Sequence, residues 1–197
     1  MLISVKDKLS LFRVPRPLII SSSEWKEDPN THLLHLQNIF QDKLIIVRSS
    51  AADEDLKNSS LAGEYDSVLN IDSSDSVSIK EAINKVIASY RKNGSSSPED
   101  EIIIQEMVQN SVMSGVIFTH DLNTGAPYYV INYDDQSGLT DTVTSGDGKY
   151  ANRTLYVHRN SIDKLRSERF IGLLQAVHEL EYVMGSQLLD IEFALGK

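Results

Sequence analysis

The stretch of residues 44–65 constrains the fold most, because a short apolar run changes there into a long polar segment. Leu44 to Val47 is an unbroken apolar run with β-branched residues, which is typical of a buried strand. Arg48 stands where this predicted strand ends, and a loop rich in serine and aspartate follows it. An arginine beside backbone N–H groups and hydroxyls suits a polyphosphate, because its guanidinium offers fixed, forked donors. The alternative is that Arg48 simply pairs with Asp53 or Asp55.

Composition and charge narrow the class of protein. The chain has 197 residues, 41% of them hydrophobic, so it can bury one large core or form two smaller lobes. Its net charge of -9 argues against a nucleic-acid partner. Without cysteine, it has neither disulfides nor a cysteine nucleophile. The chain starts without the apolar core of a signal peptide and has no apolar run that would span a bilayer, so we expect a cytoplasmic protein without a membrane partner.

The first half of the chain predicts alternating strands and helices. Strands are expected at residues 18–20, 44–47 and 64–71, and helices at residues 31–40 and from residue 78 onward. The first helix is expected to be capped by Asn30 or Thr31, and the second to open with a capping box at residues 78–81. In the strand 64–71, every second residue is expected to share an apolar face. The segment 93–98 reads as a linker, which predicts one lobe over residues 1–100 and another over 101–197.

The second half predicts an antiparallel sheet, because several strands follow one another at short spacing. We expect strands at residues 101–108, 114–119, 128–133, 153–158 and 188–194. A long amphipathic helix is expected to begin at Ser161 and to end at Gly185. His178 lies near its apolar stripe and is expected to be structural.

Several segments together resemble the ATP-binding domain of the phosphoenolpyruvate synthase and pyruvate, phosphate dikinase family. They are Val-Arg-Ser-Ser-Ala at 47–51, Glu-Asp-Leu at 54–56, Ser-Leu-Ala-Gly-Glu-Tyr at 60–65, Gln-Glu-Met-Val at 105–108, Ser-Gly-Val-Ile-Phe-Thr at 114–119 and Asp-Ile-Glu at 190–192. The resemblance covers nearly the whole chain and is weakest before Val14. It implies an α+β, ATP-grasp-like fold in which nucleotide lies between two lobes with mainly antiparallel sheet.

The resemblance also implies roles for individual residues in binding ATP. Arg48 would be the catalytic residue that holds the phosphates, together with Ser49 and Ser50. The backbone of residues 106–108, which are Glu106, Met107 and Val108, would form the hinge against which adenine lies. The alternative is that the Met107 and Val108 side chains are ordinary core residues.

Two further assignments rest on segments that depart from the family pattern. Lys6 or Lys8 is a candidate for the phosphate-binding lysine, although the family's glycines are missing there and each could equally be a solvated surface residue. Asp141 stands where relatives have glutamate and would contact the sugar, and Thr140 replaces a glycine. Asp141 could alternatively be a simple turn former.

The carboxylates of Asp190 and Glu192 form a candidate metal site. Residues 188–194 alternate, so both side chains are expected on one sheet face. Carboxylates on a strand supply the rigid, hard oxygen ligands that Mg2+ requires, although a solvated acidic face is the alternative. On the resemblance, Glu192 binds the magnesium of ATP-Mg, and Asp190 is its neighbour.

The resemblance implies a phosphotransferase that uses ATP-Mg to phosphorylate a histidine on a domain absent from this chain. The sequence ends at Lys197, before the family's Gln-x-Arg strand and acceptor-binding domains, so we expect a fragment that is inactive in isolation. The alternative is a non-catalytic nucleotide-sensing or interaction module of the same fold. A purely structural domain is a third hypothesis, and it predicts no nucleotide binding.

Overall fold

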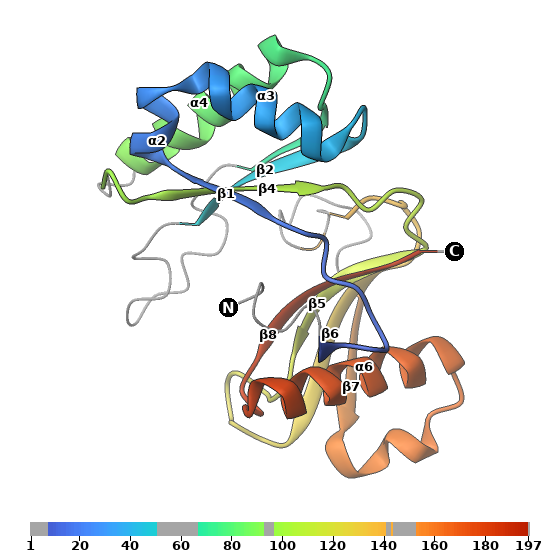
Figure 1. Cartoon of the computed structure of the whole chain (residues 1–197). Coiled ribbons are helices and arrows are strands. Elements are labelled where there is room, and N and C mark those ends of the chain that lie inside the picture. Colours follow the sequence, from blue (N-terminus) through green and yellow to red (C-terminus); the bar gives the residue numbers. More distant parts are fainter. Residues whose placement is uncertain (1–7, 51–66, 93–96, 141–142, 144–152, 197) are drawn as a thin grey trace. The chain divides into compact units, whose positions relative to one another are not determined.

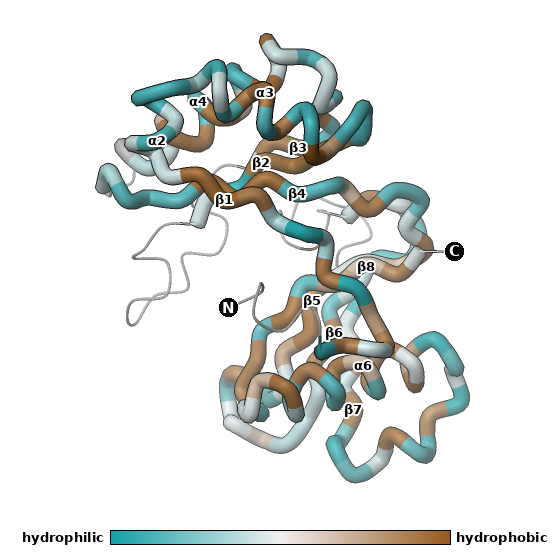
Figure 2. The backbone as a smooth tube through the Cα atoms, in the orientation of Figure 1, coloured by the Kyte–Doolittle hydropathy of each residue, from teal (hydrophilic) through white to brown (hydrophobic). Residues whose placement is uncertain are grey.

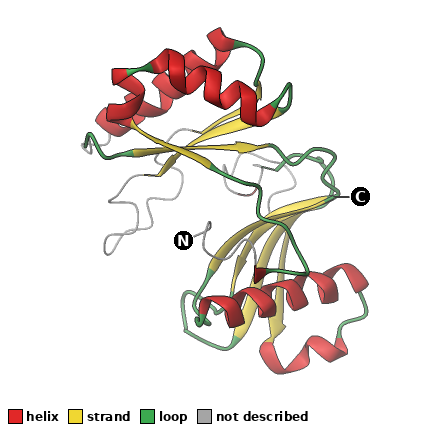
Figure 3. Cartoon of the chain, viewed as in Figure 1, coloured by secondary structure: helices red, strands yellow, loops and turns green. Residues whose placement is uncertain are grey.

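A computed structural model describes residues 8–50, 67–92, 97–140, 143 and 153–196 (Figure 1). The chain divides into two compact units. The first unit is Pro15–Met107, and the second unit is Val108–Lys197 together with Met1–Val14. Each unit combines an antiparallel sheet with helices, as Figure 3 shows, which confirms the expected mixture of helices and antiparallel strands.

The first unit has a four-stranded antiparallel sheet in the order β1-β4-β2-β3. Its helices lie on one face of this sheet (Figure 1). The elements in chain order are β1 (Leu18–Ser21), α2 (Ser22–Glu27), α3 (Pro29–Phe40), β2 (Leu44–Ser50), β3 (Ser67–Asp72), α4 (Ser76–Lys92) and β4 (Glu101–Glu106).

The core of the first unit lies between its sheet and its helices. The strands contribute Ile45, Val47 and Ile104, and the helices contribute Leu36 and Val86, all fully buried. Figure 2 shows the hydrophobic colour running along β1 and β2. Each such side chain adds about 1.5–3 kcal/mol of transfer free energy when it leaves water, so this layer accounts for the cohesion of the unit.

Local capping explains why the helices begin earlier than predicted. The side chain of Asp28 accepts a hydrogen bond from the N–H of Thr31, and Pro29 occupies the first turn, so α3 is capped by Asp28 rather than by Asn30 or Thr31. The predicted capping box at residues 78–81 is also wrong. Asp75 accepts hydrogen bonds from the N–H groups of Val77 and Ser78, and α4 therefore starts at Ser76.

A bulge in β3 breaks the predicted alternation. Ile71 pairs with Ile45, but Val68 pairs with Val47, so β3 carries one more residue than β2 between these two pairs. Asn70 has a φ of 58°, a left-handed conformation that asparagine tolerates better than most residues. As a result Val68 and Ile71 both pack on the core, although their spacing of three residues does not fit a regular strand.

The boundary expected near residue 100 differs from the observed division. β4 pairs with β1 on one side and with β2 on the other, so it is an interior strand of the first unit. The division falls instead between Met107 and Val108. The linker-like composition of residues 93–98 marks the connection from α4 to β4, within one unit.

The second unit has a four-stranded antiparallel sheet in the order β7-β6-β5-β8, and α6 packs on one of its faces. Its described elements are β5 (Met113–Phe118), β6 (Tyr128–Asp134), β7 (Arg153–His158), the 3-10 helix η2 (Arg159–Lys164), α6 (Glu168–Met184) and β8 (Asp190–Leu195). The core combines Ile117, Tyr129 and Ile131 of the sheet with Leu174 and Val177 of the helix.

The long helix of the second unit does not begin at Ser161 as predicted. Residues 159–164 form η2, and α6 starts at Glu168 after Ser167. Leu165 has an extended backbone that separates the two helices. The predicted end is confirmed, because Gly185 adopts a left-handed φ of 64° and closes α6. Within the described residues, no helix combines the length and apolar character needed to cross a bilayer.

Gly115 is predicted to be the least replaceable glycine that the structure describes. A Cβ added there would lie 2.0 Å from the backbone oxygen of Asn132 on the neighbouring strand, so Gly115→Ala must push β5 and β6 apart. We expect this change to lower the free energy of unfolding by about 2 kcal/mol or more, measured by urea denaturation.

Gly172→Ala is the matched control for this prediction. Gly172 is exposed within α6, and a Cβ there would meet no atom within 4 Å. Alanine favours the helix by up to about 1 kcal/mol, so this variant should be as stable as the parent or more stable. Similar losses for both variants would contradict the close approach of β5 and β6.

Candidate functional site

Arg48 was predicted to stand at the end of its strand. Instead, it lies within β2. The backbone of Arg48 pairs with Ile103 of β4 and with Ser67 of β3, and the ladder with β4 continues to Ser50. Backbone pairing depends on a neighbouring strand rather than on apolar side chains, which explains why β2 continues through polar residues. Because Ile45 and Val47 face the helices, alternation directs the half-buried Arg48 to the opposite sheet face.

A buried tyrosine fixes the end of β2 where the candidate phosphate residues Ser49 and Ser50 lie. The hydroxyl of Tyr90 accepts a hydrogen bond from the N–H of Ser50 at 3.0 Å and donates to the carbonyl of Glu101. Tyr90 is 1% exposed, so these bonds form inside the core of the first unit. The N–H of Ser50 is therefore already used, and the hydroxyls of Ser49 and Ser50 remain the candidate phosphate contacts.

The end of β4 carries the candidate adenine hinge. The N–H of Met107 donates to the carbonyl of Leu44 at 2.9 Å, and its sulfur accepts from the N–H of Asn70. Alternation along an extended strand directs the backbone groups of Glu106 away from β2. The side chain of Glu106 forms an ion pair with Lys43 at 2.8 Å, and Val108 is partly exposed. The Glu106 backbone, rather than its side chain, is thus the part suited to a base.

Asp190 and Glu192 lie on one face of β8, as predicted from the alternation. Ile191 lies between the two carboxylates in sequence, and Phe193 follows Glu192. Both apolar residues pack on the core with α6, so the two carboxylates point to the opposite face of the sheet. Partial desolvation of the Asp190 carboxyl, together with the neighbouring charge of Glu192, raises the pKa of Asp190. The charges therefore repel each other, and a cation placed beside them would relieve this repulsion.

The donor set fits Mg2+ in its chemistry. Two carboxylates supply hard oxygen ligands, and Mg2+ commonly keeps several waters and takes the rest of its ligands from substrate phosphates. In the described part of the chain, no cluster of at least three histidine, cysteine, aspartate or glutamate residues could hold a metal without such help. Asp190 and Glu192 are thus suited to a metal that arrives with a nucleotide.

The remaining predicted residues lie near or beyond the edges of the described segments. Lys6 and Asp141 fall outside the described residues. Lys8 is exposed and belongs to the second unit. Just after it, the N–H groups of Ser10 and Leu11 both donate to the carboxylate of Glu179 on α6, at 2.8 and 2.9 Å, which fastens this segment to the helix.

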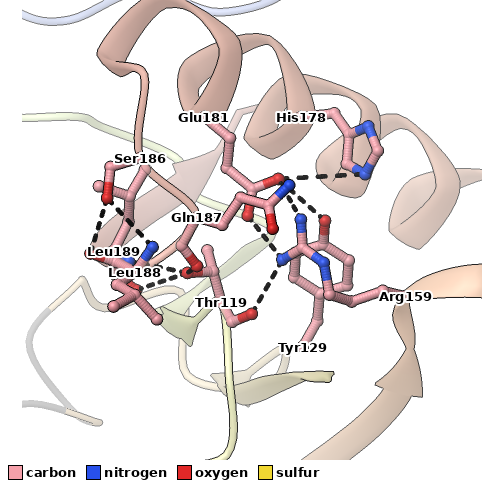
Figure 4. Close-up of polar contacts among 9 residues, drawn as sticks. All are labelled: Thr119, Tyr129, Arg159, His178, Glu181, Ser186, Gln187, Leu188 and Leu189. Carbon is pink, nitrogen blue, oxygen red and sulfur yellow. Dashed lines mark hydrogen bonds and ion pairs between the residues drawn. The ribbon is translucent and has the colours of Figure 1, made fainter. Parts of the chain in front are cut away.

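A buried polar cluster in the second unit was not predicted from the sequence (Figure 4). Arg159 of η2 donates to both carboxylate oxygens of Glu181 on α6, at 2.7 and 2.8 Å. The hydroxyl of Tyr129 also donates to Glu181, at 3.1 Å, and the guanidinium of Arg159 stacks over the Tyr129 ring. Burial and the charge of Glu181 raise the pKa of Tyr129, so its hydroxyl remains a proton donor.

A signal for this cluster was present in the sequence. Phe170, Leu174, Val177 and Glu181 follow one another at helical spacing, so Glu181 lies on the buried stripe of α6. A carboxylate on such a stripe requires a cationic partner. The partner, Arg159, follows β7 directly, and only the fold shows that these two segments meet.

Breaking the ion pair between Arg159 and Glu181 is predicted to cost far more stability than breaking an exposed pair. Glu181 is 6% exposed, so Arg159→Met leaves its buried charge with only the exposed His178, 4.0 Å away, and should destabilise the fold by about 3–5 kcal/mol in urea denaturation. The double variant Arg159→Met/Glu181→Leu should recover most of this loss, because no buried charge remains.

The exposed pair of Lys43 and Glu106 provides the control. Their side chains are 50% and 33% exposed, so Lys43→Met should cost less than about 1 kcal/mol. A loss for Arg159→Met as small as that for Lys43→Met would contradict the role assigned to the buried pair.

Comparison with known proteins identifies the family. The pyruvate phosphate dikinase AMP/ATP-binding domain matches residues 18–161. The chain is 30% identical to the "Uncharacterized phosphotransferase YvkC" of Bacillus subtilis, over 64% of this chain and 16% of that protein. It is 31% identical to a probable phosphoenolpyruvate synthase of Methanothermobacter thermautotrophicus, over 73% of this chain and 23% of that protein. It is 36% identical to a phosphoenolpyruvate synthase of Neisseria meningitidis serogroup B, over 52% of this chain and 14% of that protein.

The chain thus spans less than a quarter of each of these relatives. The matched domain includes the whole of the first unit's sheet and most strands of the second unit. It ends before β8, so Asp190 and Glu192 lie beyond the match. Because the match covers most of the sequence, the chain belongs to the pyruvate phosphate dikinase AMP/ATP-binding domain family.

Proposed function

We propose that this chain is the ATP-binding part of a phosphotransferase of the phosphoenolpyruvate synthase and pyruvate, phosphate dikinase type. The observation that carries the proposal is the match to an AMP/ATP-binding domain over residues 18–161. The relatives are themselves named as phosphotransferases or phosphoenolpyruvate synthases, which supports a role in phosphoryl transfer. The two antiparallel sheets with helices are consistent with an ATP-grasp-like fold, which we include in the proposal.

Arg48 is proposed to bind the phosphates of ATP, with the hydroxyls of Ser49 and Ser50. The support for this assignment is the position of Arg48 in the sheet. Arg48 lies on the sheet face that the helices leave open, and the pairing with β4 fixes its position along the strand. A guanidinium donates two parallel hydrogen bonds to phosphate oxygens, and these bonds strengthen as charge shifts during transfer. Lys6 or Lys8 would add a second cation, and Asp141 would contact the sugar.

The adenine is proposed to contact the chain where β4 ends. There the Glu106 carbonyl points away from β2, so it is available to accept a hydrogen bond from an exocyclic amino group. The Val108 N–H would donate to a ring nitrogen. Apolar side chains such as Met107 and Val108 would cover the faces of the ring.

Glu192, with Asp190, is proposed to hold Mg2+. When bound with ATP, Mg2+ neutralises phosphate charge and keeps the phosphate oxygens in a fixed geometry. The residues of this chain would then act by position and charge: Arg48 orients the phosphate tail, and the two carboxylates hold their place on β8. The acceptor is proposed to be a histidine on another domain, which takes one phosphoryl group from ATP, while a second phosphoryl group passes to water or phosphate and AMP leaves.

Removing the guanidinium of Arg48 should weaken ATP binding. Hydrogen bonds to charged groups contribute about 1.5–3 kcal/mol, so Arg48→Ala should raise the dissociation constant of ATP-Mg about 10- to 100-fold, measured by calorimetry on this chain. Thermal unfolding of the variant checks that it is folded.

Lys80→Ala is the matched control, because it also removes one positive charge from the first unit. Lys80 lies in the helix layer, where its Nζ donates to Asn30 of α3, away from the face that carries Arg48. This variant should bind ATP-Mg within about twofold of the parent. Equal affinities of the parent and Arg48→Ala would refute the assignment of Arg48.

A further inference from the structure

Thr119 follows β5 directly and closes the ladder between β5 and β8. Its N–H donates to the carbonyl of Leu189 at 3.0 Å. Its hydroxyl accepts from the N–H of Leu189 at 2.7 Å and donates to the carbonyl of Gln187, also at 2.7 Å (Figure 4). Thr119 is fully buried, so these bonds form out of contact with water. The Thr119 hydroxyl thus bonds two backbone groups just before β8, the N–H of Leu189 and the carbonyl of Gln187.

These bonds set where the carboxylates of β8 fall. Leu189 immediately precedes Asp190, which pairs with Phe118, and Glu192 pairs with Val116. The side chains of a strand alternate between its faces, so a slip of one residue would turn both carboxylates toward α6 and expose the apolar residues between them. The hydrogen bonds between Thr119 and Leu189 therefore help to determine which face of the sheet Asp190 and Glu192 occupy.

Thr119 is itself held by the buried ion pair. The carbonyl of Thr119 accepts a hydrogen bond from Arg159 at 3.0 Å, and Arg159 is locked by its two bonds to Glu181 of α6. Glu181 of α6 thus holds Arg159, and Arg159 in turn holds Thr119 at the end of β5, which bonds the residues before β8. A charged pair with several bonds gives a rigid support, because each partner has few other positions in which its charge is satisfied.

The hydroxyl is what makes threonine necessary at this position. A valine has nearly the same shape but would leave the N–H of Leu189 and the carbonyl of Gln187 without this partner. A serine would keep both bonds and lose only a methyl group. The pair of substitutions therefore separates the hydrogen bonds of Thr119 from its packing.

We infer that Thr119 is a positioning residue for the metal-binding carboxylates of β8, acting through the backbone of Leu189 and Gln187. The inference rests on the proposed function, because it requires that Asp190 and Glu192 hold Mg2+. Arg159 and Glu181 hold Thr119 on the face of the sheet that packs against α6, whereas Asp190 and Glu192 project from the opposite face.

The test uses Mn2+ as a spectroscopic substitute for Mg2+ and the full 197-residue chain. Free Mn2+ is measured by electron paramagnetic resonance in titrations of the parent, Thr119→Val and Thr119→Ser, each with a non-hydrolysable ATP analogue present, and the analogue without protein gives the background. Loss of a residue that orients metal ligands commonly lowers metal affinity about 10- to 100-fold, so Thr119→Val should bind Mn2+ at least about 10-fold more weakly. Thr119→Ser should stay within about threefold of the parent.

Amide hydrogen exchange and a second variant distinguish positioning from folding. In Thr119→Val, exchange at Leu189 should rise while exchange in the first unit stays unchanged. If Thr119→Val does not fold, Thr119→Cys replaces it, because sulfur keeps the size and weakens both hydrogen bonds. Parental Mn2+ affinity in a folded variant with faster exchange at Leu189 would overturn the inference.

Glu192→Gln separates the two proposals. If Glu192→Gln binds Mn2+ like the parent, or the parent binds none, the metal role fails, and the inference about Thr119 fails with it. If Glu192→Gln loses Mn2+ while Thr119→Val retains it, the metal role stands and only the positioning role is overturned. If Glu192→Gln and Thr119→Val both lose Mn2+ binding and Thr119→Ser retains it, both proposals are supported.

Discussion

The pairing of β4 with β1 and β2 is the constraint on which the first unit depends. Ile102 and Ile104 are fully buried between the sheet and the helices, so β4 cannot shift without opening the core. The same ladder sets Arg48 opposite Ile103, and the last bond of the ladder, from Met107 to Leu44, fixes the strand end. One interior strand therefore holds in place both the proposed phosphate residue and the proposed adenine hinge.

The second unit relies on a different kind of interaction. Its sheet and α6 share an apolar core, but the end of β5, the start of β8 and η2 meet at the charged pair of Arg159 and Glu181. A buried pair of this kind is costly to break and adds little net stability, and we propose that here it specifies geometry. Here that geometry places Leu189, and the carboxylates that follow it, in one register.

Apolar periodicity predicted most of the strands and the placement of Asp190 and Glu192 on one face, because burial dictates alternation. It missed features that tertiary contacts decide. The bulge at Asn70 depends on fitting both Val68 and Ile71 into one core, and the strand character of Arg48 depends on its partner β4. Resemblance to the family motifs indicated the candidate nucleotide residues, and these stay predictions. No local pattern revealed that Arg159 would meet Glu181, since the two segments approach only after folding.

A crystal structure of the chain with Mn2+ and a non-hydrolysable ATP analogue tests the central claim most directly. The account predicts phosphate oxygens within hydrogen-bond distance of the Arg48 guanidinium, adenine beside the backbone of Glu106 and Val108, and an anomalous Mn2+ peak at the carboxylate of Glu192. A nucleotide bound away from Arg48, or a metal without contact to Glu192, would contradict it.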